Sequence, residues 1–141
     1  MTAQDIIVAA LECLRVPFRH QGRQIAPGAD QGIDCVGVAV HVASRCGLKY
    51  VDQQGYGRTP AGTALLDALD AQPCLRVVKR IDMQPGDLLA MRFERAAQHV
   101  AIYTGATIIH AYSSAGLCCE HDFTPTWQRR VMRVYRFVEP Q

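Results

Sequence analysis

PGDLLAMRFERAAQHVAIYTGATIIHAYS, residues 85–113, is the stretch that decides the fold. It holds three short segments rich in β-branched and aromatic residues, GDLLAMRF (86–93), HVAIYTG (99–105) and TIIHAYS (107–113). Turn residues such as Pro85-Gly86-Asp87 and Gly105 separate them. Short segments of this composition between turn signals are typical of β-strands, so we expect consecutive strands here.

The same pattern continues on both sides of this stretch. LRVVKRI (75–81) precedes it, and GLCCEHDF (116–123) and VMRVYRFV (131–138) follow it. Helical spacing is confined to the N-terminal half of the chain, and helices followed by strands indicate an α+β domain. We therefore expect N-terminal helices packed on an antiparallel sheet of about five to six strands.

Three helices are expected before residue 75. Thr2 and Asp5 resemble a capping box, which opens a first helix that ends near Val16-Pro17. Its expected apolar positions are Ile7, Ala10, Leu11 and Leu14. Segment 36–46, VGVAVHVASRC, is apolar nearly all round and predicts a buried helix that stops at Gly47.

The third expected helix is short. Thr59-Pro60 is typical of an N-cap followed by proline at the first helical position. The helix that it opens carries Leu65, Leu66 and Leu69.

Composition excludes several classes of protein. The chain has 141 residues, a net charge of +2 and scattered basic residues, which leaves no electrostatic footprint for nucleic acid. We expect one domain over residues 1–141. The N-terminus lacks the features of a secretory signal and no segment approaches membrane-spanning length, so we expect no membrane insertion and a cytoplasmic protein as synthesised. The six cysteines are expected to be reduced.

Cys35 is the candidate nucleophile. It lies in GIDCVGVA (32–39), directly after a loop and at the first turn of the expected buried helix. Amide groups and the helix dipole at that position favour a thiolate. Free cysteine is also among the most buried residue types, so its place alone favours a packing role.

A nucleophilic cysteine needs a base, and strand parity points to His99 and His110. A two-residue hairpin loop at Thr104-Gly105 places the two histidines directly opposite, whereas a loop at Gly105-Ala106 places them diagonally. Either loop puts both rings on one face of the sheet, and a three-residue loop would separate them. On one face, His99 can serve as the base and His110 can orient its ring.

Other chemistries fit the sequence less well. His41 is six residues along the helix from Cys35, about 9 Å of rise, and is too far to contact its sulfur. Cys118, Cys119 and His121 suggest zinc, but adjacent strand residues face opposite sides and no second ligand pair has the required spacing. The carboxylates form no obvious pair and no phosphate-binding glycine loop is present. We therefore expect no metal and no cofactor.

The order of these motifs resembles that of the NlpC-like cell-wall cysteine peptidases, in particular the phage-type members with a single domain. The resemblance rests on five segments and covers nearly the whole chain: VPFRHQGR (16–23), GIDCVGVA (32–39), QPGDLLAMR (84–92), QHVAIYTG (98–105) and IIHAYS (108–113). GRTPAGTALLDAL (57–69) is similar to a stretch of the phage-type members.

The resemblance implies a papain-like fold and hydrolysis of a peptidoglycan stem peptide, typically between γ-D-glutamate and diaminopimelate. It assigns Cys35, His99 and His110 as the catalytic set, with the Cys35 amide as an oxyanion donor. Phe18, Arg19 and Asp34 are candidate substrate contacts. Many relatives carry tyrosine at the position of Phe18 and serine at that of Val36, so a hydroxyl group is missing here.

Three alternatives remain open. The first is the endopeptidase, whose phage-type relatives imply delivery by a virion tail to the host envelope and partners among phage-tail proteins. The second is an amidase or acyltransferase on the same fold. The third is a catalytically weak structural component of a phage-tail-like assembly.

Overall fold

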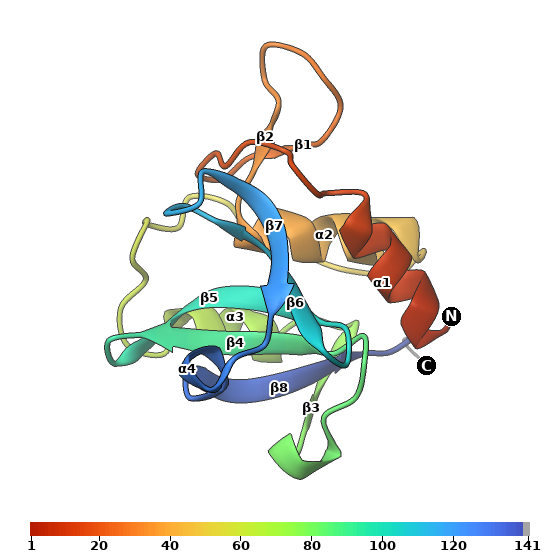
Figure 1. Cartoon of the computed structure of the whole chain (residues 1–141), viewed down its shortest axis with the longest axis vertical. Coiled ribbons are helices and arrows are strands. Elements are labelled where there is room, and N and C mark those ends of the chain that lie inside the picture. Colours follow the sequence, from red (N-terminus) through yellow and green to blue (C-terminus); the bar gives the residue numbers. More distant parts are fainter. Residues whose placement is uncertain (140–141) are drawn as a thin grey trace.

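The computed structural model describes residues 1–139. Its helices are α1 (Ala3–Leu11), α2 (Cys35–Arg45), α3 (Ala64–Asp70) and α4 (Pro125–Gln128), with a 3₁₀ helix, η1 (Arg80–Asp82). Its strands are β1 (Arg23–Gln24), β2 (Gly32–Ile33), β3 (Leu75–Val78), β4 (Leu88–Phe93), β5 (Ala96–Tyr103), β6 (Thr107–Tyr112), β7 (Leu117–Asp122) and β8 (Val131–Phe137). The expected α+β order, helices first and the main strands afterwards, is confirmed (Figure 1).

The main sheet has six antiparallel strands in the order β3-β8-β4-β5-β6-β7. Each of the six segments predicted as a strand forms one of them. Strands β1 and β2 form a separate small pair in the loop before α2. In Figure 1, α1 and α2 lie side by side against the sheet, and α4 lies near β8.

Helix α1 begins as predicted and ends earlier than predicted. Thr2 Oγ1 accepts the Asp5 amide while the Asp5 carboxylate accepts the Thr2 amide, which is the expected capping box. The helix stops at Leu11, because the chain then turns through Arg15 at φ 70° and hydrogen-bonds to Cys118 on β7. Its buried face is also displaced by one position from the predicted one: Ile6, Ala9 and Ala10 are buried, whereas Leu11 is exposed.

Helix α2 is buried on one side only. Val38 and Val42 are buried in the core, whereas Val36 and Val40 are half-buried and line a cavity. The apolar character all round the helix therefore reflects a core on one side and a cavity on the other. The helix ends at the predicted glycine, because Gly47 has φ 69° and the last carbonyls are capped from the residues that follow.

Helix α3 starts later than predicted. Its N-cap is Thr63, and Thr59-Pro60 lies in the loop before it, where both residues line the cavity. Proline suited to a helix start is equally suited to a loop, so the dipeptide gave the wrong boundary.

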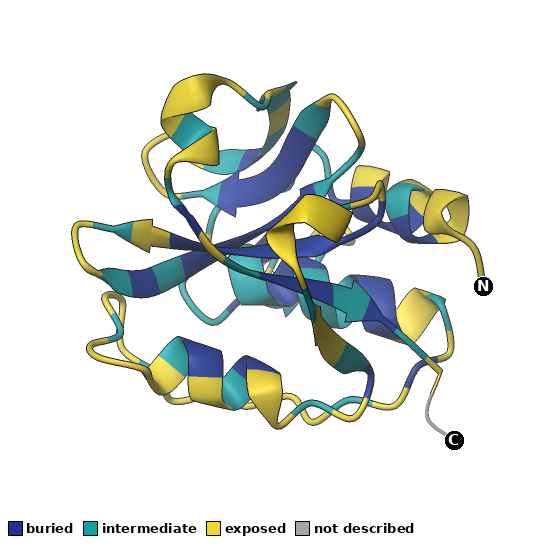
Figure 2. Cartoon of the chain, turned by 90° about the horizontal axis from the view of Figure 1, so that it is seen from below, coloured by how far each residue is buried: buried dark blue, intermediate teal, exposed yellow. Residues whose placement is uncertain are grey.

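Burial follows the layers of the fold. Figure 2 shows buried residues concentrated in the central strands and on the inner sides of the helices, with exposed residues on the outer turns. Val38 and Val42 of α2 belong to one core cluster with Val100 and Ile102 of β5. A second cluster, which includes Ala101 and Ile108, covers the opposite face of the sheet, where Trp127 of α4 packs against it. No helix within residues 1–139 is both long and apolar enough to cross a bilayer.

The close approach of α2 to the preceding loop generates a stability prediction. A Cβ atom on Gly37 would lie 2.6 Å from the Gly22 carbonyl oxygen, so Gly37→Ala must displace backbone. We expect it to lower the free energy of unfolding in urea by about 1 to 3 kcal/mol. Gly57→Ala is the control, because nothing lies within 4 Å of its added methyl group. Equal unfolding midpoints for the two variants would contradict the close contact.

Candidate active site

Cys35 is the first residue of α2 and lines a cavity of about 360 Å³. The cavity lies between α2, α3, the loop around Tyr56 and the ends of the sheet strands, and its walls are mostly apolar. Three backbone amides, those of Val100, Val36 and Cys35 itself, act on the thiol and favour its ionised form. Two of these amides belong to the start of α2, as expected from the sequence, and the third lies on β5.

Asp34 fixes the start of this helix. It is buried, and one carboxylate oxygen accepts the Gly37 amide at 2.8 Å and an Arg23 guanidinium N–H at 2.9 Å. The other oxygen accepts the Gln21 amide at 2.9 Å and the Tyr56 hydroxyl. Both oxygens are thus engaged within the protein. Asp34 lines the cavity, and its carboxylate serves to hold α2, the β1 loop and the Tyr56 loop together.

His99 and His110 lie on one face of the sheet, as strand parity predicted. Tyr103 pairs with Ile108 and the Thr104 amide donates to the Thr107 carbonyl, so the hairpin loop is Gly105-Ala106. This is the loop that places the two histidines diagonally. His99 Nε2 and His110 Nδ1 are 2.5 Å apart, and both residues are buried.

A third histidine continues this contact. His110 Nε2 lies 2.8 Å from His121 Nε2, and His121 Nδ1 lies 2.9 Å from the Asp122 carbonyl oxygen. A carbonyl can only accept, so His121 Nδ1 carries a proton. When all three rings are neutral, His110 Nε2 then donates to His121, and His99 Nε2 donates to His110. We call this row of hydrogen bonds, from His99 through His110 to His121, the histidine relay. It leaves His99 Nδ1 unprotonated.

Burial keeps these groups uncharged. Burial, followed by His110 and then by Arg130 and His121, holds the pKa of His99 well below its usual range. Burial and then His121 lower the pKa of His110 to about 3. Burial and the Asp34 carboxylate raise the pKa of the Cys35 thiol to about 12, against the opposite effect of the three amides. These shifts favour a neutral thiol over the thiolate expected from the helix start, because desolvation acts more strongly than the amides.

Cys35 and His99 line the same cavity from different elements. No hydrogen bond joins the Cys35 thiol to the His99 ring, and among the described side chains only His110 hydrogen-bonds to that ring. The rings of Phe93, Tyr112 and Trp127 pack around it, with centroids 5.3 to 6.4 Å away. A neutral thiol beside a neutral imidazole with a free Nδ1 can react by general-base proton transfer at the moment of attack.

The three candidate substrate contacts lie in different places. Phe18 lines the cavity, and Asp34 lines it with its carboxylate already engaged. Arg19 does not line it; its guanidinium pairs with Asp30 at 3.5 Å on the exposed side of the loop. His41 lies away from the site and bonds to Glu12, as its distance along the helix implied.

Sequence reasoning missed His121 and Tyr56. His121 entered only as a zinc candidate beside Cys118 and Cys119, although parity applied to the second hairpin finds it. The β6–β7 register pairs His110 with Cys119 and Ile108 with His121, so His121 shares the face of His110. Nothing in the local sequence marks Tyr56, because it lies in a loop and reaches Asp34 only through the tertiary fold.

A cysteine at a helix start, a histidine relay on an antiparallel sheet and a cavity between them define the papain-like class of α+β proteins. A model of the NlpC/P60 family matches residues 15–136, and the chain belongs to that family. The family predicted from the motif order is therefore confirmed. No curated protein sequence matches the chain.

Solved structures share the fold. The peptidoglycan hydrolase RipB from Mycobacterium tuberculosis is 22% identical with a TM-score of 0.69, over 97% of this chain and 65% of RipB. The P60 domain of an antigen from M. avium subspecies paratuberculosis is 19% identical with a TM-score of 0.69, over 97% and 95% of the two chains. An NLP/P60 family protein from Staphylococcus aureus is 22% identical with a TM-score of 0.67, over 97% and 41%.

These structures differ from the chain in length. The chain spans 65% of RipB and 41% of the staphylococcal protein. At these sequence identities, the comparison shows that the fold is shared.

The raised thiol pKa generates a prediction for the rate of alkylation. In short pulses of iodoacetamide, labelling of Cys35 should rise about tenfold per pH unit from pH 7 to beyond pH 10, because the thiolate fraction grows over that whole range. An unstructured cysteine peptide with blocked termini, whose thiol pKa is about 8.5, should level off earlier. Peptide mass spectrometry assigns the label. A plateau for Cys35 near neutral pH would show a resting thiolate instead.

Proposed function

We propose that this protein is a peptidoglycan endopeptidase that cleaves a stem-peptide bond through a thioester at Cys35. The observation that carries the proposal is the 2.5 Å contact of His110 with His99, which lines the same cavity as Cys35. A base whose second nitrogen is held by another side chain, next to a cysteine at a helix start, is the arrangement of acyl transfer by a thiol. The peptidoglycan hydrolase RipB has the same fold.

In the proposed mechanism, His99 Nδ1 takes the proton of Cys35 while the sulfur attacks the scissile carbonyl carbon. The Cys35 backbone amide stabilises the oxyanion of the tetrahedral intermediate. The imidazolium then gives its proton to the leaving amine, the carbon–nitrogen bond breaks, and the acyl group remains on sulfur. Water, deprotonated by His99, hydrolyses the thioester and restores the thiol.

His110 acts as a positioning residue in this mechanism. Its Nδ1 accepts the hydrogen bond from His99 Nε2–H, so the basic lone pair of neutral His99 lies on Nδ1. The bond between γ-D-glutamate and diaminopimelate is the proposed target, with Phe18 in contact with the substrate. We also propose that the protein acts as part of a phage tail and binds other tail proteins. The similarity of residues 57–69 to phage-type members supports this part of the proposal.

A second candidate function is acyl transfer or amide hydrolysis on a substrate with an apolar group. The apolar lining of the cavity supports it, because aliphatic and aromatic side chains surround Cys35 on the α2 and α3 sides. The same thioester would form, and mass spectrometry of the products would separate the reactions. A new amide or ester indicates transfer, whereas a free carboxylate and amine indicate hydrolysis.

Loss of the thiol tests the nucleophile. Wild-type protein should release fragments from purified peptidoglycan or from a γ-D-glutamyl-diaminopimelyl peptide, and Cys35→Ala should lower the rate by about a thousandfold or more. Cys46→Ala is the matched control, since Cys46 lies at the far end of α2. Wild-type protein that neither cleaves these substrates nor acquires a label at Cys35 would falsify the proposal.

Paired substitutions test the positioning role of His110. His110→Leu removes the acceptor for His99 Nε2 and should lower kcat by about 10 to 100-fold, with a much smaller change in KM. His110→Asn keeps a carbonyl acceptor near the same place and should recover part of that loss. Steady-state kinetics on the cleaved peptide measure both. Equal kcat values for the two variants would indicate a packing role alone.

A further inference from the structure

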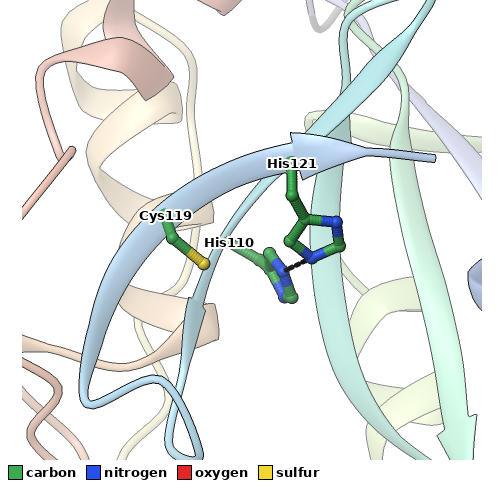
Figure 3. Close-up of side chains that lie close together, drawn as sticks. All are labelled: His110, Cys119 and His121. Carbon is green, nitrogen blue, oxygen red and sulfur yellow. Dashed lines mark hydrogen bonds between the residues drawn. The ribbon is translucent and has the colours of Figure 1, made fainter.

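Two histidines of the relay, His110 and His121, bring metal-ligating atoms close to that of Cys119. His110 on β6 and Cys119 and His121 on β7 each offer one ligand atom, and these atoms all lie within 4.8 Å of one another. Figure 3 shows the Cys119 sulfur and the His121 ring on either side of His110. His110 is fully buried, whereas Cys119 and His121 are half-buried, so the cluster opens to solvent on one side.

Strand register builds this cluster. His110 pairs directly with Cys119, and His121 pairs with Ile108, two residues along β6 from His110. All three side chains therefore lie on one face of a two-stranded ladder, where the backbone fixes their spacing. From the sequence, only Cys118, Cys119 and His121 were candidate zinc ligands. Cys118 is buried on the other face of the strand, and His110 takes its place as the third ligand.

The donor set matches a soft divalent cation. Two imidazole nitrogens and one thiolate suit Zn²⁺ or Co²⁺, with water as a fourth ligand on the open side. Both ring nitrogens opposite the ligand atoms are already held: His121 Nδ1 donates to the Asp122 carbonyl, and His110 Nδ1 contacts His99. The two Nε2 atoms, now 2.8 Å apart, would separate to roughly 3.3 Å for tetrahedral bonds of 2.0 Å.

We propose that His110, Cys119 and His121 bind a zinc-class divalent cation, and that the bound cation switches off the base by reversing the histidine relay. The cation takes the lone pairs of both Nε2 atoms and of the Cys119 sulfur. The Cys119 S–H proton leaves to solvent as the sulfur–metal bond forms. The thiolate charge offsets part of the cation's charge.

The relay reverses because a metal-bound Nε2 cannot carry a proton. His110 loses its Nε2 proton to solvent and takes the His99 Nε2 proton on Nδ1, across the 2.5 Å contact. His99 Nε2 then accepts this hydrogen bond, and His99 takes a proton from solvent on Nδ1. The net release is one proton, from Cys119. His99 Nδ1 becomes a donor and can no longer take the Cys35 proton; this loss of activity rests on the proposed function, whereas metal binding does not.

Binding is tested in the Cys35→Ala protein, which removes the nucleophilic thiol as a competing ligand. Titration with Co²⁺ should give one equivalent of tetrahedral cobalt with a sulfur-to-cobalt charge-transfer band, and Zn²⁺ should displace it. Adding Cys119→Ser should abolish the band, and adding Cys46→Ser should leave it unchanged. No band in Cys35→Ala, or a band that survives Cys119→Ser, overturns the site.

The relay is tested by ¹⁵N NMR of histidine in the same Cys35→Ala protein. Zinc should move the His99 proton from Nε2 to Nδ1, a readout independent of peptidase activity. An unchanged His99 tautomer with zinc bound overturns the switch.

Activity gives the last arm of the experiment. Saturating zinc should lower the wild-type cleavage rate by roughly 100-fold, as for loss of a general base, and should lower that of Cys119→Ser less than about twofold relative to its own metal-free rate. Equal inhibition of both proteins would place the zinc on Cys35 and His99 and overturn the switch. A protein that cleaves no substrate contradicts the proposed function, while the cobalt and NMR measurements still decide the metal site.

Discussion

The Asp34 carboxylate is the interaction on which the geometry of the site depends. Its four hydrogen bonds join the first turn of α2, the loop before β1 and the loop that carries Tyr56. These three segments are distant in sequence, and each contributes to the wall around Cys35. A buried carboxylate that lost one donor would leave unsatisfied charge in the core, so the four contacts hold together as a set.

Electrostatics at the site follow from exclusion of water. The amides at the start of α2 stabilise a thiolate, yet desolvation and the adjacent Asp34 charge raise the pKa of Cys35 more than the amides lower it. The same dry surroundings keep His99 and His110 neutral. In the proposed mechanism, charge is created only when the sulfur attacks the substrate, at a place where amide dipoles already act on the sulfur.

Much of this structure could be predicted from local sequence. Six strands, the capping box at Thr2 and the glycine stop of α2 are set by residue types within a few positions, and hairpin parity placed His99 and His110 on one face. Boundaries that depend on distant partners could not be predicted: α1 ends early because residues 15–18 bond to β7 and its turn. The contact of Tyr56 with Asp34 and the ionisation of Cys35 depend on tertiary burial, which no local pattern encodes.

The short pairing between β5 and β6 has a further consequence. Their ladder comprises Ile102 with Ile109 and Tyr103 with Ile108. Beyond this ladder, the Val100 amide hydrogen-bonds to the Cys35 thiol. The ring-to-ring bond between His99 and His110 spans the two strands where backbone pairing has stopped. It links β5 to β6 across an interrupted ladder, so the orientation of the His99 ring and the local association of these two strands depend on the same bond.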